Sequence, residues 1–100
     1  MILYNVTVNI DPDIHEEWLS WMKQVHIPEV MSCGLFTESR IMRVLSTEAG
    51  EGFTYSIQYH LESMDAFHEY ELLHAEALRK KHRERDKDKF VAFRTLLESA

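Results

Sequence analysis

The stretch that decides the fold is residues 2–10, ILYNVTVNI, which is followed directly by Asp11 and Pro12. Apolar and polar residues alternate along it, so it predicts a strand with one apolar face and one polar face. The period then changes, because Asp11 can cap a helix with its carboxylate and Pro12 suits the first helical position. The chain therefore begins as a strand that leads into a helix.

This first helix carries an apolar stripe at helical spacing, made of Ile14, Trp18, Trp21, Met22 and Val25. Pro28 lacks a backbone N–H and disfavours helical geometry at the residue before it, so we expect a kink or break at residues 26–28. A short turn through residues 29–31 should follow and end at Gly34.

The rest of the chain predicts three more strands and a second helix. Residues 35–46 form a strand of mixed faces, residues 47–52 fit a hairpin loop, and residues 53–61 alternate clearly. Ser63 can cap the second helix, and a last strand covers residues 90–97. The apolar stripe of the second helix consists of Phe67, Tyr70, His74, Ala77 and Leu78.

This order of elements predicts one α+β domain, residues 1–100, with ferredoxin-like βαββαβ topology: a two-layer sandwich with a four-stranded antiparallel sheet. The helices should cover the sheet face that holds Val6, Val8, Tyr55, Ile57, Val91 and Phe93. The opposite face should carry Leu3, Asn5, Thr7, Ser56, Gln58, Phe90, Ala92, Arg94 and Leu96. Because apolar residues there would be exposed in a lone chain, we expect a twofold homodimer through this face.

Residues 4–9 (YNVTVN), residues 18–22 with 26–31, and residues 90–98 (FVAFRTLLE) resemble a small bacterial family of domains of unknown function. That family belongs to the dimeric α/β-barrel group, in which two ferredoxin-like sheets close into one barrel with the helices outside. The resemblance implies a dimer, and it implies no activity, since the family has none assigned.

The wider barrel group includes cofactor-free monooxygenases, haem-degrading enzymes, small-lactone isomerases and ligand-sensing domains. The haem-degrading members use an Asn on the first strand, a Trp and a proximal His. Asn5 matches the first of these, but the end of the third strand holds Tyr59, His60 and Leu61 and no Trp. We therefore expect no cofactor.

Composition argues against several other classes of function. A net charge of −6 works against nonspecific binding of nucleic acid, and the basic run of residues 79–89 is interleaved with acids, which predicts a solvated helix end. A single cysteine, Cys33, can form neither an intrachain disulfide nor a thiol metal site. The start of the chain does not fit a signal peptide and no segment fits a membrane span, so we expect a cytoplasmic protein.

Polar residues of the open sheet face form the first candidate site. Asn5, Thr7, Ser56, Gln58 and Arg94 would line the interior of a closed barrel, where buried polar atoms need partners. Two interpretations stay open: a hydrogen-bond network, with Arg94 paired to Glu38, or a pocket for a small anionic or carbonyl compound.

Two histidines are the second candidates. His26 stands at the expected break and His74 in the apolar stripe, and each is either a structural imidazole or a polar group in a cleft. His68, His74 and His82 are six and eight residues apart, not the three or four that place two ligands on one helical face. We expect no metal site.

Two functions fit these patterns. The first is a homodimeric small-ligand-binding or assembly module, with Asn5, His26, Gln58, His74 and Arg94 as its ligand-binding residues. The alternative is a cofactor-free enzyme of the monooxygenase or isomerase kind, acting on a small organic substrate in the barrel or the helix–sheet cleft. A sizeable enclosed cavity beside a histidine would favour the enzyme, and a filled core would favour the module.

Overall fold

Four antiparallel strands form one sheet in the order β2-β3-β1-β4. The computed structural model describes residues 1–46 and 52–100, so most of the expected hairpin loop, residues 47–51, lies outside the described residues. The strands are β1 (Ile2–Ile10), β2 (Glu38–Arg43), β3 (Phe53–Leu61) and β4 (Phe90–Glu98). The predicted ferredoxin-like α+β fold is confirmed.

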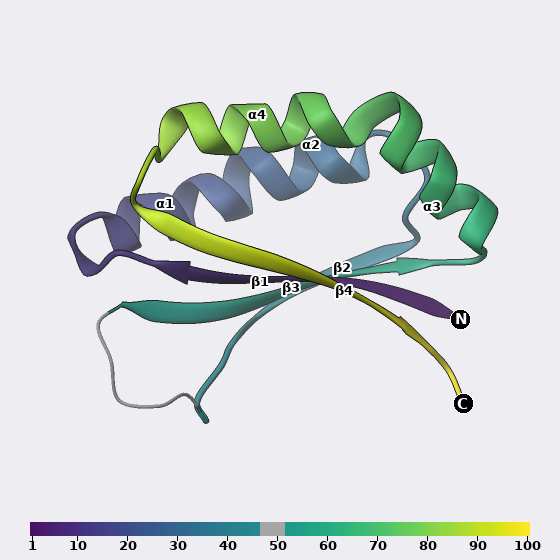
Figure 1. Cartoon of the computed structure of the whole chain (residues 1–100), viewed down its shortest axis with the longest axis horizontal. Coiled ribbons are helices and arrows are strands. Elements are labelled where there is room, and N and C mark those ends of the chain that lie inside the picture. The colour runs from purple at the N-terminus through teal and green to yellow at the C-terminus, as the bar shows by residue number, and fades with distance from the viewer. Residues whose placement is uncertain (47–51) are drawn as a thin grey trace.

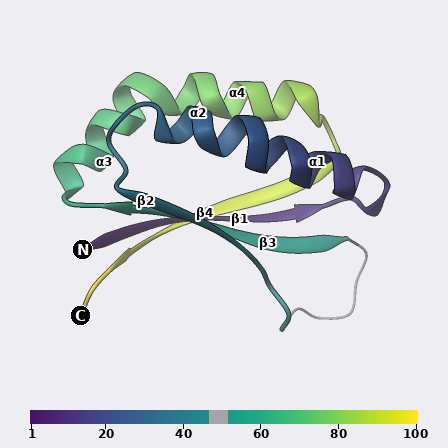
Figure 2. The same ribbon diagram turned by 180° about the vertical axis from the view of Figure 1, so that it is seen from behind.

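Two helical rods pack on the same face of this sheet, and the other face is bare (Figures 1 and 2). The first rod contains a 3-10 turn η1 (Pro12–Ile14), α1 (His15–Trp21), a π turn η2 (Met22–His26) and α2 (Ile27–Met31). The second contains α3 (Met64–Tyr70), a π turn η3 (Glu71–Ala75) and α4 (Glu76–Arg85). Within the described residues, none of these helices has the length and apolarity that crossing a bilayer requires.

Both predicted helix caps are confirmed. The Asp11 carboxylate accepts a hydrogen bond from the Asp13 N–H at 2.8 Å, and the Ser63 hydroxyl accepts one from the Ala66 N–H at 3.2 Å. Each cap satisfies a backbone donor that the first helical turn would leave unpaired. They fix where each rod leaves the sheet.

Of the kink or break expected at residues 26–28, the break does not occur, and the turn expected at residues 29–31 is wrong. The chain stays helical through Ile27–Met31 because the π turn before it has room for the proline: the Ile27 N–H donates to the Met22 carbonyl, five residues back. Pro28 then lies in the first turn of α2, where an absent N–H costs little. The extra residue rotates the helix, so Val25 of the predicted stripe is exposed.

The π turn η3 rotates the second rod in the same way. The buried residues of the second rod are Tyr70, Ala75 and His82. Tyr70 and Ala75 are five residues apart, one more than the four that separate neighbours on one face of an α-helix. As a result Ala77, which the sequence placed in the apolar stripe, is exposed, and His74 is only half-buried.

The core lies between the rods and the inner strands. Along β1 and β3, residues of one alternating set point toward the helices, as predicted, and Val8, Ile57 and Leu61 are almost fully buried. Strand β2 is shorter than the predicted 35–46, and its register turns Ile41 toward the helices beside Ile57.

The predicted facing of β4 is wrong. Its register with β1 pairs Phe90 with Ile10 and Arg94 with Val6, so Phe90, Ala92, Arg94 and Leu96 lie on the helix side. Val91 and Phe93, which were expected in the core, lie on the bare face instead.

The turn that follows α4 determines this facing of β4. Asp88 adopts a left-handed backbone with φ of 62°, and the Lys89 N–H donates to the Asp86 carbonyl at 3.0 Å. The Lys89 carbonyl accepts from the Asp11 N–H at 2.9 Å, which ties the turn to the end of β1. Phe90 therefore enters the sheet directly beneath His82, and the two rings stack with centroids 3.9 Å apart.

Candidate functional site

A small enclosed cavity lies between the two rods and the sheet. Its volume is about 30 Å³, which is room for about two water molecules and for no organic ligand. Two buried donor or acceptor atoms in its lining residues, His26 Nδ1 and Arg79 Nε, have no partner among the described residues. The lining residues are Tyr4, Val6, Val8, Met22, His26, Val30, Ile57, Tyr59, Tyr70, Leu78, Arg79, His82 and Arg94.

His82 is the best-buried imidazole of this region. The Trp18 Nε1–H donates to its Nε2 at 3.0 Å, and an indole N–H can only donate. Nε2 must therefore accept, and the ring proton lies on Nδ1. Burial lowers the pKa of His82 to about 3, with the charges of His26, Arg94 and Arg85 acting in the same direction. The ring is neutral at pH 7.

His26 points into the same region from the other rod. Its ring stacks on Trp21 at 4.8 Å and lies 5.6 Å from the ring of His82, measured between centroids. Burial lowers the pKa of His26 to about 4, although the Glu29 carboxylate opposes the shift. Two neutral imidazoles thus face each other across the rods.

Asp86 closes the outer end of this cluster at the C-terminus of α4. Its Oδ1 accepts from Arg85 Nη1 at 2.5 Å, and its buried Oδ2 has no hydrogen-bond partner among the described residues. Burial raises the pKa of the Asp86 carboxyl, against the opposing charge of Arg85. The Arg85 guanidinium in turn lies 4.9 Å above the ring of Trp21.

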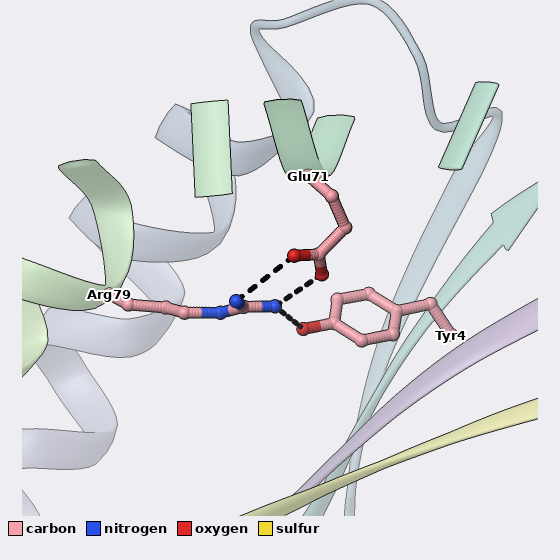
Figure 3. A network of polar contacts seen from close by, with 3 residues as sticks. All are labelled: Tyr4, Glu71 and Arg79. Carbon is pink, nitrogen blue, oxygen red and sulfur yellow. Dashed lines mark hydrogen bonds and ion pairs between the residues drawn. The ribbon is translucent and has the colours of Figure 1, made fainter. Parts of the chain in front are cut away.

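Arg79 is held from two sides, as Figure 3 shows. Its Nη1 and Nη2 donate to the two carboxylate oxygens of Glu71 at 3.2 and 2.5 Å, and Nη2 also donates to the Tyr4 hydroxyl at 3.0 Å. In a regular α-helix Glu71 and Arg79 would be offset by about 80° around the axis, and the extra residue of η3 reduces this offset. Burial opposes the charge, but the bonds to Glu71 and Tyr4 outweigh it and raise the pKa of Arg79.

A larger cleft opens outside the cavity, between α4 and the edge strand β4. Its volume is about 460 Å³, within the range of small-molecule sites. Arg79, His82 and Arg94 line both spaces, so these three side chains separate the outer cleft from the inner cavity. The cleft is lined by Arg79, His82, Arg83, Lys87, Asp88, Phe90, Val91, Ala92 and Arg94.

The candidate site residues predicted from the sequence lie in different parts of the structure. Asn5 and Gln58 do lie on the bare face with Thr7 and Ser56, in one chain of hydrogen bonds: Gln58 donates to Ser56, Ser56 to Asn5, and Asn5 to Thr7. Each of these polar groups has a partner within the chain. Asn5 does not line the helix–sheet cavity.

Arg94 is not part of that network, which corrects the prediction. It lies on the helix side of β4, and the suggested pair with Glu38 does not form, since Glu38 pairs with Arg40 at 3.6 Å. His26 does reach the helix–sheet cavity. His74 instead lines a shallow groove between the rods, with Glu29 and Cys33, away from the sheet.

Sequence reasoning missed His82 and Arg79, which it assigned to a solvated basic run. Their burial follows from η3, because one extra residue after Tyr70 brings Ala75, Leu78 and His82 onto one face. The recurrence of apolar residues from Ala75 onward at helical spacing could have revealed the shift. Across residues 1–46 and 52–100, no group of three or more His, Cys, Asp or Glu side chains is arranged to hold a metal ion.

The sheet order and the helices on one face define a ferredoxin-like domain. The chain belongs to the family described as Domain of unknown function (DUF4286), whose model matches residues 1–100. Membership of a domain-of-unknown-function family is thereby confirmed. No curated protein matches the chain.

Several solved structures share the fold. A putative antibiotic biosynthesis monooxygenase from Deinococcus radiodurans is 15% identical, with a TM-score of 0.70 over 100% of this chain and 93% of its own. A dimeric ferredoxin-like protein from an uncultured marine organism is 12% identical, with a TM-score of 0.69 over 100% and 95%. A variant of MhuD with two manganese protoporphyrin IX molecules bound per active site is 16% identical, with a TM-score of 0.70 over 100% and 95%.

Proposed function

We propose that the chain is a homodimeric module that binds a small organic ligand in the cleft between α4 and β4. The observation that carries the proposal is the pairing of a nearly filled core with an outer cleft of about 460 Å³. The cavity of about 30 Å³ leaves no room for a substrate beside His26, so a ligand near the two buried imidazoles would have to lie in the outer cleft, which His82 also lines.

The bare face of the sheet supports the dimer. Val91, Phe93 and Leu97 are 71%, 61% and 48% exposed there, on one edge strand. Neighbouring large apolar residues at such exposure are typical of an interface, and a second copy would cover them. A dimeric ferredoxin-like protein among the structural neighbours supports the same assembly.

A fragment screen by ligand-observed NMR tests the binding function. We expect fragments to bind the wild-type protein and to lose binding in Ala92→Phe, because the larger side chain fills the floor of the cleft. Ala77→Phe is the matched control, since Ala77 is exposed at the groove between the rods and does not line the cleft. If fragments bind equally to both variants, or none binds at all, the cleft is not a ligand site.

The alternative, a cofactor-free monooxygenase or isomerase, rests on His82. The neutral ring carries its proton on Nδ1 and His82 lines the cleft, so this N–H could donate a hydrogen bond to an oxygen atom of a bound substrate. Mass spectrometry of any bound compound after aerobic incubation tests this function. An enzyme would convert the compound with the wild-type protein and not with His82→Gln.

A further inference from the structure

We propose that the ligand of the α4–β4 cleft is an organic carboxylate with a flat apolar body, and that Arg94 binds its carboxylate. This inference rests on the proposed binding function and adds the chemical class of the ligand. It follows from three features of the cleft: its hydrogen-bond donors, its unpaired charge and its flat wall.

Apart from the Asp88 carboxylate, the polar side chains that line the cleft are hydrogen-bond donors. The guanidinium of Arg94 can only donate, and so can those of Arg79 and Arg83, but Glu71 and Glu76 already accept from the latter two. His82 also lines the cleft, and its proton lies on Nδ1 because its Nε2 accepts from Trp18. A ligand that satisfies these groups must bring acceptors, and a carboxylate brings two acceptor oxygens without a competing donor.

Among the cleft's cations in the described residues, Arg94 and Lys87 have no ion pair, and Arg94 is the one that lies on β4. Arg79 is neutralised by Glu71 and Arg83 by Glu76, whereas Arg94 has no ion pair among the described residues. It stands on β4 beside Val6, with no carboxylate of the cleft lining on its own strand. In a chain of net charge −6, this guanidinium is a local site for an anion.

A flat apolar wall completes the cleft next to Arg94. The rings of His82 and Phe90, which both line the cleft, stack at 3.9 Å with an interplanar angle of 4°. Ala92 separates Phe90 from Arg94 along the same face of β4, and its small side chain leaves space above the strand. We expect a planar body to lie in this space with its carboxylate directed at Arg94.

Isothermal titration with two matched compounds tests the inference. They are 2-naphthoate and 2-naphthylmethanol, which share one ring system and differ in the charge of the head group. We expect 2-naphthoate to bind at least tenfold more tightly, and Arg94→Gln to remove that preference, which is the size expected for one charge-assisted hydrogen-bonded pair. Lys80→Gln removes the same charge from an exposed position on α4 outside the cleft and should leave the preference intact.

The inference is overturned if both compounds bind equally well, or if Arg94→Gln keeps the preference for 2-naphthoate while circular dichroism shows a normal fold. Binding of either compound that Ala92→Phe abolishes would then leave the proposed binding function standing. If neither compound binds, the carboxylate class is wrong, and the fragment screen decides whether the binding function falls with it.

Discussion

Strands β3 and β4 are both nine residues long and both alternate, yet they use their faces in opposite ways. In β3 the apolar set, which includes Tyr55 and Ile57, points into the core. In β4 the more apolar set, Val91, Phe93 and Leu97, points away from the helices, and the helix side carries Arg94. Alternation therefore reveals two faces of a strand, but not which of them the chain itself covers.

The difference between β3 and β4 shows which apolar residues are buried by the chain itself and which are left exposed. Strand β3 is internal and its apolar face meets the helices directly, so its stability comes from within the chain. Strand β4 is an edge strand whose inner face lines a polar cleft, and its apolar residues are left for another surface. Strand β4 therefore contributes one face to the proposed ligand site and the other face to the proposed dimer interface.

The largest expected effect comes from truncating the inner face of β3. Ile57→Ala removes a side chain that is 1% exposed and should lower the free energy of unfolding by about 2–5 kcal/mol, from lost burial and an unfilled cavity. Urea denaturation at fixed protein concentration measures it. Leu72→Ala, at an exposed helical position, should change the same quantity by less than about 0.5 kcal/mol.

The next effect belongs to the outer face of β4. Phe93→Asp should leave the helical content unchanged but weaken dimerisation by about a hundredfold, because it buries a charge at an apolar contact. Light scattering coupled to size-exclusion chromatography follows the dimer. Leu72→Asp introduces the same charge away from the sheet and should not alter assembly; an unchanged dimer in Phe93→Asp would instead place the interface elsewhere.

A smaller effect tests whether the inner face of β4 really covers His82. The unfolded chain takes up protons at its histidines as the pH falls through 6.5, whereas the folded pKa of His82 is about 3 and that of His26 about 4. Between the folded pKa values and 6.5, the unfolded state binds more protons than the folded state. The free energy of unfolding should therefore decrease as the pH is lowered across this range.

From pH 7 to pH 5 we expect His82 to account for a loss of roughly 1–2 kcal/mol in the free energy of unfolding. Asp86, whose raised pKa favours the fold at low pH, reduces the net loss. Urea denaturation at both pH values measures the change, and His82→Gln should show a loss smaller by that amount. An equal loss in wild type and variant would mean that Phe90 leaves His82 open to solvent.

The sequence predicted those parts of the fold where one residue or one strict period determines the outcome. Residues 2–10 alternate strictly and form β1 with those bounds, and the caps Asp11 and Ser63 lie where their side chains indicated. The two histidines proposed for the helix–sheet cleft were predicted less accurately. His26 lines the cavity there, but His74 does not, because η3 shifts the buried face of the helix by one residue.

What could not be predicted depends on contacts distant in the sequence. The facing of β4 follows from the turn around Asp88 and its tie to Asp11, and no local pattern in residues 90–97 reveals it. The burial of His82 depends on the π turn before it and on Trp18 from the other rod. Both are properties of the packed structure rather than of a short stretch of chain.

Sedimentation velocity of the wild-type protein at micromolar concentration tests the central claim, that a second copy covers the apolar face of β4, most directly. We predict a single species with the mass of two chains, that is, twice 11.9 kDa. A species with the mass of one chain would contradict the account, because Val91, Phe93 and Leu97 would then be left in contact with water.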